Sequence, residues 1–97
     1  MNKKTSYLTT LAKAFSDLHG CQAKHLETVP VVEQFKGKIV WEGEVEIFAL
    51  TNHPKAKKGY AWSYNENDKD HVTVVLELPP VISPKTAVQA SIASQAK

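Results

Sequence analysis

Cysteine is almost absent from this sequence: Cys21 is the single one among 97 residues. One thiol forms no internal disulfide, which excludes a small secreted domain held together by disulfides and favours a reducing, cytoplasmic location. Cys21 lies between His19 and His25, and zinc accepts both ligand types. A closed zinc site needs four ligands, however, and the other two histidines, His53 and His71, fall in separate predicted loops. We therefore expect no metal and no cofactor.

The same segment is the one place where nucleophilic catalysis can be imagined, with His19 or His25 activating the thiol of Cys21. The sequence offers no residue that would orient the histidine and no oxyanion loop. Lone cysteines in small intracellular domains are more often packing residues than nucleophiles. We assign no catalytic residue, and a small metal-dependent or Cys/His-dependent enzyme is the weakest of our three functional hypotheses.

Long apolar runs are also missing. A helix that spans a membrane needs about 20 predominantly apolar residues, and no run in this sequence approaches that length. The basic start, with Lys3 and Lys4, is not followed by the apolar core of a signal peptide, because polar residues interrupt residues 5–18. We expect a cytoplasmic protein that does not act at a membrane.

The sequence also lacks a large excess of basic or acidic residues, and it lacks glycine-rich motifs. Twelve basic and ten acidic residues give a net charge of +2, too balanced to indicate nucleic-acid binding unless the lysines cluster in space. The four glycines stand apart, so no phosphate-binding glycine loop is present. A hydrophobic content of 42% and a charged content of 23% are ordinary for a globular chain. The length fits one domain over residues 1–97.

What the sequence does contain is a long alternating run over residues 38–50. Its odd positions are almost all apolar, whereas three of its even positions are Glu42, Glu44 and Glu46. Because a strand sends alternate side chains to opposite faces, the run predicts a long strand with one packed face and one wet face. We interpret the three glutamates as a solvated strand face rather than as a carboxylate site.

The other elements follow from periodicity and from turn signals. Ser83-Pro84 is typical of a helix start, since serine caps the helix and proline suits its first position. Lys36-Gly37 predicts a tight turn that makes a hairpin of the strands before and after it. The remaining predicted elements are a helix over 6–18 that ends before Gly20, an edge strand over 29–35 that contains Pro30, and strands over 60–64 and 71–78.

The predicted order is therefore helix, four strands, helix. Short connections between consecutive strands favour an antiparallel meander. We expect an α+β fold of two layers, with both helices on one face of the sheet. The residues predicted to form the core are Leu11, Phe15, Val45, Ile47, Val74, Leu76 and Ile92.

A basic loop followed by aromatic residues supplies the second functional hypothesis. Lys55, Lys57 and Lys58 could contact phosphates, together with Lys85 at the start of the last helix, and Trp62 could stack on bases. Stacking requires the face made by Tyr60, Trp62 and Tyr64 to be exposed; the alternative, which we favour, is that these rings fill a small core.

Our leading hypothesis is a small non-catalytic binding module for a protein partner or for self-association. Either an exposed face of the sheet or an edge strand would serve, because an edge strand offers unpaired backbone groups to a partner. The strand that contains Val29 is the predicted edge. Nucleic-acid binding is the alternative, possible but not favoured.

Overall fold

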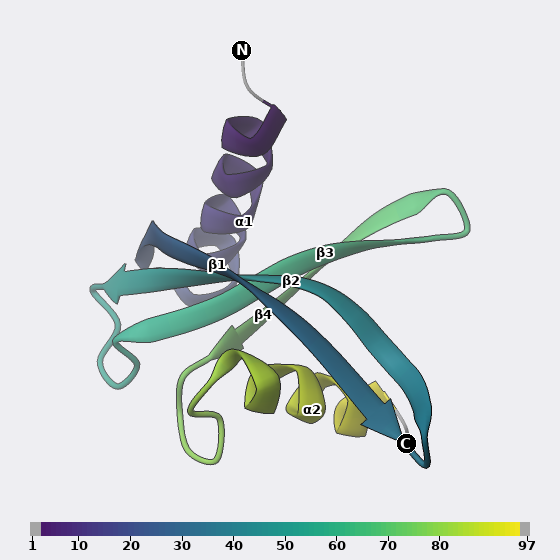
Figure 1. The fold of residues 1–97 in the computed structure, drawn as a ribbon. Coiled ribbons are helices and arrows are strands. Elements are labelled where there is room, and N and C mark those ends of the chain that lie inside the picture. Colours follow the sequence, from purple (N-terminus) through teal and green to yellow (C-terminus); the bar gives the residue numbers. More distant parts are fainter. Residues whose placement is uncertain (1–2, 96–97) are drawn as a thin grey trace.

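The computed structural model describes residues 3–95, without the side chains of residues 3–5, 65, 66 and 95. Two helices flank four strands, and Figure 1 shows their arrangement. The elements are α1 (Lys3–His19), β1 (Gln22–Phe35), β2 (Lys38–Thr51), β3 (Lys58–Glu66), β4 (Lys69–Leu76) and α2 (Pro84–Gln95). The α+β class and the predicted order of the elements are confirmed.

The four strands form one antiparallel sheet in the order β1-β2-β3-β4, as the meander prediction required. Two tight turns close its hairpins. Lys36 and Gly37 have φ values of 52° and 78°, and Asn67 and Asp68 have values of 54° and 64°. Two consecutive residues with positive φ are typical of the type I′ turn, whose twist matches that of the flanking strands. The predicted turn at Lys36-Gly37 is therefore confirmed.

The pairing between the two hairpins is short. β2 and β3 pair only from Glu46↔Ala61 to Ala49↔Lys58, whereas β1 pairs with β2, and β3 with β4, over nearly their whole lengths. Beyond this junction the two hairpins separate, and Figure 1 shows their ends pointing in different directions. The sheet is therefore a pair of two-stranded arms joined by four residue pairs. We call the hairpin of β1 and β2 the first arm and the hairpin of β3 and β4 the second arm.

The first arm carries two irregularities. The register between β1 and β2 shifts around Leu26 and again around Val40, each of which is left without a direct partner. A bulge of this kind turns the following side chains toward the opposite face of the strand. β1 also begins earlier than predicted, because residues 22–28 pair with the second half of β2.

The two helices lie on opposite faces of the sheet, so the predicted two-layer arrangement with both helices on one face is wrong. Leu11 and Phe15 of α1 pack in a cluster with Phe48 of β2, while Ala87 and Val88 of α2 pack in another with Ile47. Neighbouring residues of a strand point to opposite faces. Figure 1 accordingly shows α1 above the sheet and α2 below it.

The physical reason lies in the second half of β2, which is apolar in both directions. Val45 and Ile47 point toward α2, and Phe48 and Leu50 point toward α1; all four are buried. A strand that is apolar on both sides must be covered on both sides. The result is a three-layer arrangement of helix, sheet and helix.

The end of α1 and the start of α2 follow the predicted signals, whereas α1 begins at Lys3, three residues before its predicted start. Gly20 has a φ of 65° and donates its N–H to the carbonyl of Ser16 at 2.9 Å, which ends α1. At the start of α2, the Ser83 hydroxyl accepts the N–H of Thr86 at 3.2 Å. The Thr86 hydroxyl in turn accepts the N–H of Ser83 at 2.9 Å. This reciprocal cap satisfies donors at the helix terminus and confirms the predicted start.

The core contains most of the predicted residues. Leu11, Phe15, Val45 and Ile47 are buried, whereas Val74, Leu76 and Ile92 are half-buried. Tyr60 and Trp62, whose exposure the sequence left open, are 2% and 3% exposed. The aromatic residues of β3 therefore fill the core on the side of α2.

Gly59 occupies the junction at a point where α1 approaches the backbone closely. A Cβ atom at this position would lie 2.3 Å from Cε1 of Phe15, whose side chain is fully buried. We predict that Gly59→Ala lowers the free energy of unfolding by about 1–3 kcal/mol, because the buried ring has little room to move. Urea denaturation measures this loss. In a Phe15→Leu background the same substitution should cost clearly less; an equal cost in both backgrounds would contradict the steric explanation.

Candidate functional site

A buried carboxylate lies at the centre of the sheet on the face covered by α1. Glu46, predicted to be solvated with Glu42 and Glu44, is fully buried, while the other two glutamates are exposed as expected. The prediction is wrong for Glu46 because this residue lies in the junction between β2 and β3, where α1 covers the sheet. A buried carboxylate requires hydrogen-bond donors around it.

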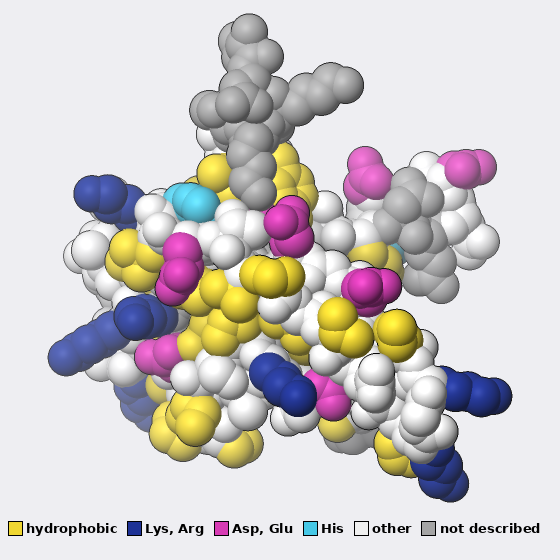
Figure 2. Space-filling view, viewed as in Figure 1, with side chains coloured by type: hydrophobic (Ala, Val, Ile, Leu, Met, Phe, Trp, Pro, Cys, Tyr) yellow, Lys and Arg dark blue, Asp and Glu magenta, His cyan; other side chains and the backbone are white. Residues whose placement is uncertain are grey.

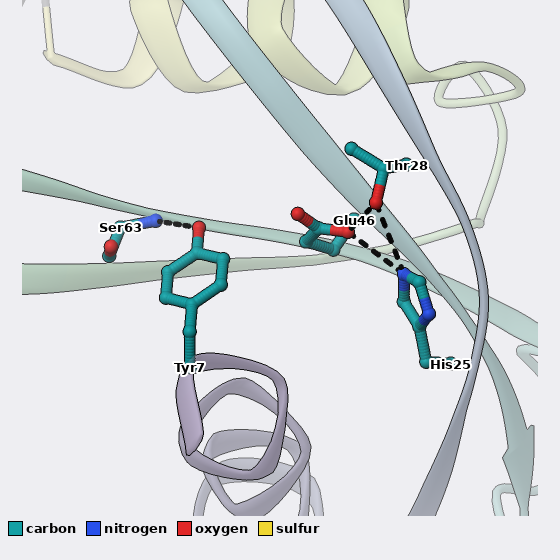
Figure 3. Close-up of polar contacts among 5 residues, drawn as sticks. All are labelled: Tyr7, His25, Thr28, Glu46 and Ser63. Carbon is teal, nitrogen blue, oxygen red and sulfur yellow. Dashed lines mark hydrogen bonds and ion pairs between the residues drawn. The ribbon is translucent and has the colours of Figure 1, made fainter. Parts of the chain in front are cut away.

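Two side chains of β1 supply such donors. His25 Nε2 lies 2.8 Å from Oε1 of Glu46, and the hydroxyl of Thr28 donates to the same oxygen. Figure 3 shows both side chains directed from β1 toward the carboxylate of β2. The bulge at Leu26 lies between His25 and Thr28 and changes the alternation, so that both side chains reach the same face. We call Glu46, His25 and Thr28 the Glu46 cluster.

Tyr7 of α1 approaches the sheet on the same face, as Figure 3 shows. Its hydroxyl accepts the backbone N–H of Ser63 at 3.2 Å. Ser63 lies two residues beyond Ala61, where the pairing between β2 and β3 has already ended. A side chain from the helix therefore provides a hydrogen-bond acceptor at the point where the two arms separate.

A hollow of about 230 Å³ opens beside the cluster, between α1 and the first two strands. His25 lines it, with its ring edge against Phe48 at a centroid distance of 5.4 Å. The Cys21 thiol is buried and points to the carbonyl oxygen of Phe15 at 3.8 Å, whereas His25 contacts Glu46. The two members of the imagined nucleophile pair thus have different partners. Within residues 3–95, no group of three or more His, Cys, Asp or Glu side chains is arranged to hold a metal ion.

The residues predicted for nucleic-acid binding are only partly brought together. Lys55 and Lys57 are exposed in the connection between β2 and β3, Lys58 is exposed at the start of β3, and Lys85 is exposed in the first turn of α2. Trp62, in contrast, is buried beneath α2 and contacts Trp41, with ring centroids 5.5 Å apart. A base needs an open ring face on which to stack, and the burial of Trp62 leaves it none.

The sheet register adds one lysine, Lys24, that was not among the residues predicted for nucleic-acid binding. Ala49 pairs with Lys58 on one side and with Lys24 on the other, so Lys24 and Lys58 lie on the two sides of β2. We call residues 52–57, which connect β2 to β3, the lysine loop. His53, treated before as a loop residue, holds this loop in place. Its Nδ1 atom accepts the backbone N–H groups of Lys55 and Ala56 at 3.1 and 2.8 Å, the role of a capping side chain.

An exposed apolar surface lies at the end of the first arm, and we call it the hairpin-tip surface. Phe35 and Val40 are 63% and 48% exposed there, whereas Ile39, 56% exposed, pairs with Gln34 and lies on the opposite face of the hairpin. Phe35 and Val40 line a groove of about 360 Å³ together with Ile92 and Ala93 of α2. The first arm extends past the ladder with β3, so no third strand flanks these side chains in the sheet.

Charged residues border this surface at its two ends. The ammonium group of Lys36 lies 5.4 Å from the centre of the Phe35 ring, and Lys38 pairs with Phe35 across the hairpin. At the other end, the side-chain amide of Gln89 donates to both carboxylate oxygens of Glu33 at 3.3 Å. In Figure 2 lysine side chains project at the lower right, where Figure 1 places the hairpin end.

Comparisons of the chain with protein-family models, with curated proteins and with solved structures gave no match in any of the three. Neither helix of the described part of the chain has the length and apolar character needed to cross a membrane. The case for a function therefore depends on the surfaces described above.

The Glu46 cluster leads to a prediction about stability. His25→Ala removes a donor from a fully buried carboxylate, and we expect it to lower the free energy of unfolding by about 1–3 kcal/mol. Chemical denaturation near neutral pH measures the effect. His19→Ala is the matched control, because His19 is exposed at the end of α1 and should change stability by less than about 0.5 kcal/mol. Equal losses in the two variants would contradict a structural role for the cluster.

Tyr60 gives a prediction about pH. Burial, followed by the hydrogen bond to Glu77 and the charge of that carboxylate, raises the pKa of the Tyr60 hydroxyl far above its ordinary value of 10.0. The unfolded chain therefore releases this proton first as the pH rises above 10, and the stability contributed by protonated Tyr60 is lost over that range. We expect Tyr60→Phe to show a shallower fall in unfolding free energy between pH 9 and 11 than the parent chain, while Tyr64→Phe keeps the parent slope. Identical slopes for all three chains would contradict the assignment.

Proposed function

We propose that this chain is a small non-catalytic binding module that takes a protein partner on the hairpin-tip surface. The observation that carries the proposal is the exposure of Phe35 and Val40 in an apolar groove that Ile92 and Ala93 of α2 also line. Contiguous apolar surface on a folded domain is typical of an interaction site, and aromatic residues at its centre are typical binding hot spots. Lys36, Lys38 and Glu33 give this apolar centre the polar rim that interfaces usually have.

A face of the arm supports binding better than the edge of β1 does. β1 is an edge strand, as predicted, but Pro30 lies in its middle and lacks an N–H group. The bulge at Leu26 interrupts the same edge. Proline and bulges are the features that hinder pairing of an edge strand with another chain. We therefore assign the partner to the face formed by the hairpin tip and α2.

Nucleic-acid binding through Lys55, Lys57 and Lys58 is the second candidate, favoured by the sheet register, which places Lys24 and Lys58 on the two sides of Ala49. With Trp62 buried, only phosphate contacts would contribute, and such binding is weak and strongly dependent on salt. We rank it below protein binding for this reason.

A selection from a displayed library of random peptides tests the proposed function. We expect peptides with apolar side chains to be selected, and Phe35→Ser to weaken their binding at least about tenfold, as the loss of a hot-spot side chain does. Fluorescence anisotropy with labelled peptides measures the affinities. Ile82→Ser is the matched control, since Ile82 is 68% exposed on the connection between β4 and α2, outside the groove.

Two results would overturn the proposal: no peptide selected above background, or equal binding by the parent chain and Phe35→Ser. Thermal unfolding of each variant accompanies the binding measurement. Phe35 is mostly exposed, so its truncation should leave the melting temperature close to that of the parent chain.

A further inference from the structure

We infer that the protein partner on the hairpin-tip surface is a second copy of this chain, related by a two-fold axis, with the two first arms antiparallel. In this arrangement Phe35 of each copy enters the groove of the other copy. The inference rests on the proposed function and specifies the partner.

The shape of the surface suits pairing with itself. A two-fold interface brings the same patch together from both copies, so the patch must contain both a projecting part and a receiving part. Phe35 projects, with 63% of its surface exposed. Val40, Ile92 and Ala93 line the receiving groove directly beside it. One surface therefore holds both halves of an apolar contact.

The charges along the arm select the antiparallel orientation. Lys36 and Lys38 lie at the tip, and Glu33 lies on the other side of Phe35, about 7 Å along β1 from Phe35 by strand rise. When the arms run antiparallel, the lysines of one copy lie opposite Glu33 of the other copy. When they run parallel, like charges meet, which disfavours that orientation.

The size of the patch indicates a weak dimer. A phenylalanine side chain buries about 150–250 Å² when it is fully covered, so this patch buries on the order of a few hundred Å² per copy. Stable dimers bury about 1,200–2,000 Å² in total, and smaller interfaces belong to transient complexes. We therefore expect dissociation in the micromolar range or above, with an equilibrium that depends on protein concentration.

Charge exchange tests the arrangement by sedimentation velocity over a series of protein concentrations. The parent chain should shift from monomer toward dimer as concentration rises. Glu33→Lys alone and Lys36→Glu/Lys38→Glu alone should each stay monomeric at least about tenfold higher in concentration, because each homodimer would set like charges together. An equimolar mixture of the two variants should recover dimers, since every pair in the mixed dimer again joins opposite charges.

Lys55→Glu/Lys57→Glu is the matched control. It makes the same change in net charge as the tip variant, but at exposed positions outside the surface, so it should dimerise like the parent chain. A mixture that stays monomeric, or exchange variants that dimerise like the parent, would overturn the inference.

These experiments distinguish failure of the proposed dimer from failure of the proposed protein-binding function. A parent chain that stays monomeric at millimolar concentration, yet binds selected peptides through Phe35, overturns the second copy as partner and leaves protein binding standing. A chain that neither dimerises nor binds peptides overturns both.

Discussion

The rest of the structure depends on the short ladder between β2 and β3. Among the described residues, four pairs, from Glu46↔Ala61 to Ala49↔Lys58, form the ladder that joins the two hairpins within the sheet. Ile47 lies in the ladder and packs toward α2, while Phe48 and Ala61 pack toward α1. Each helix thus covers one side of the same small junction. The hydrophobic contacts on both faces, more than the ladder itself, hold the hairpins together.

The position of this junction explains why one carboxylate is buried and why one apolar surface is exposed. Glu46 is buried because it occupies the junction, and its burial requires the donors of His25 and Thr28. Phe35 is exposed because it lies at the end of the first arm, beyond the junction around which the two helices pack. The buried carboxylate and the open apolar surface are therefore two results of one geometry.

The sequence was sufficient to predict the helices and strands, but it did not show which face of the sheet each helix covers. Alternation predicted β2, and Ser83-Pro84 predicted the start of α2, because both signals are local. Alternation could not assign the helices to faces, since residues 45–50 are apolar on both sides apart from Glu46. The burial of Glu46 depends on partners about twenty residues away and on the bulge at Leu26, and neither leaves a periodic signal. His53 was missed for a similar reason, because its capping role exists only in the folded loop.

The type I′ turn at Lys36-Gly37 has a consequence for how this architecture tolerates insertions and deletions. The arm that it closes pairs with no third strand beyond the junction, so its length is independent of the β2–β3 ladder. Side chains repeat their facing every two residues, so adding or removing two residues in each strand leaves every remaining side chain on its face. The reach of the tip can therefore increase in steps of roughly 7 Å by pairs added beyond Phe35 and Lys38, while the junction and the contacts of α2 with the arm are kept. Single-residue changes instead require a bulge, which is the accommodation that Val40 already makes.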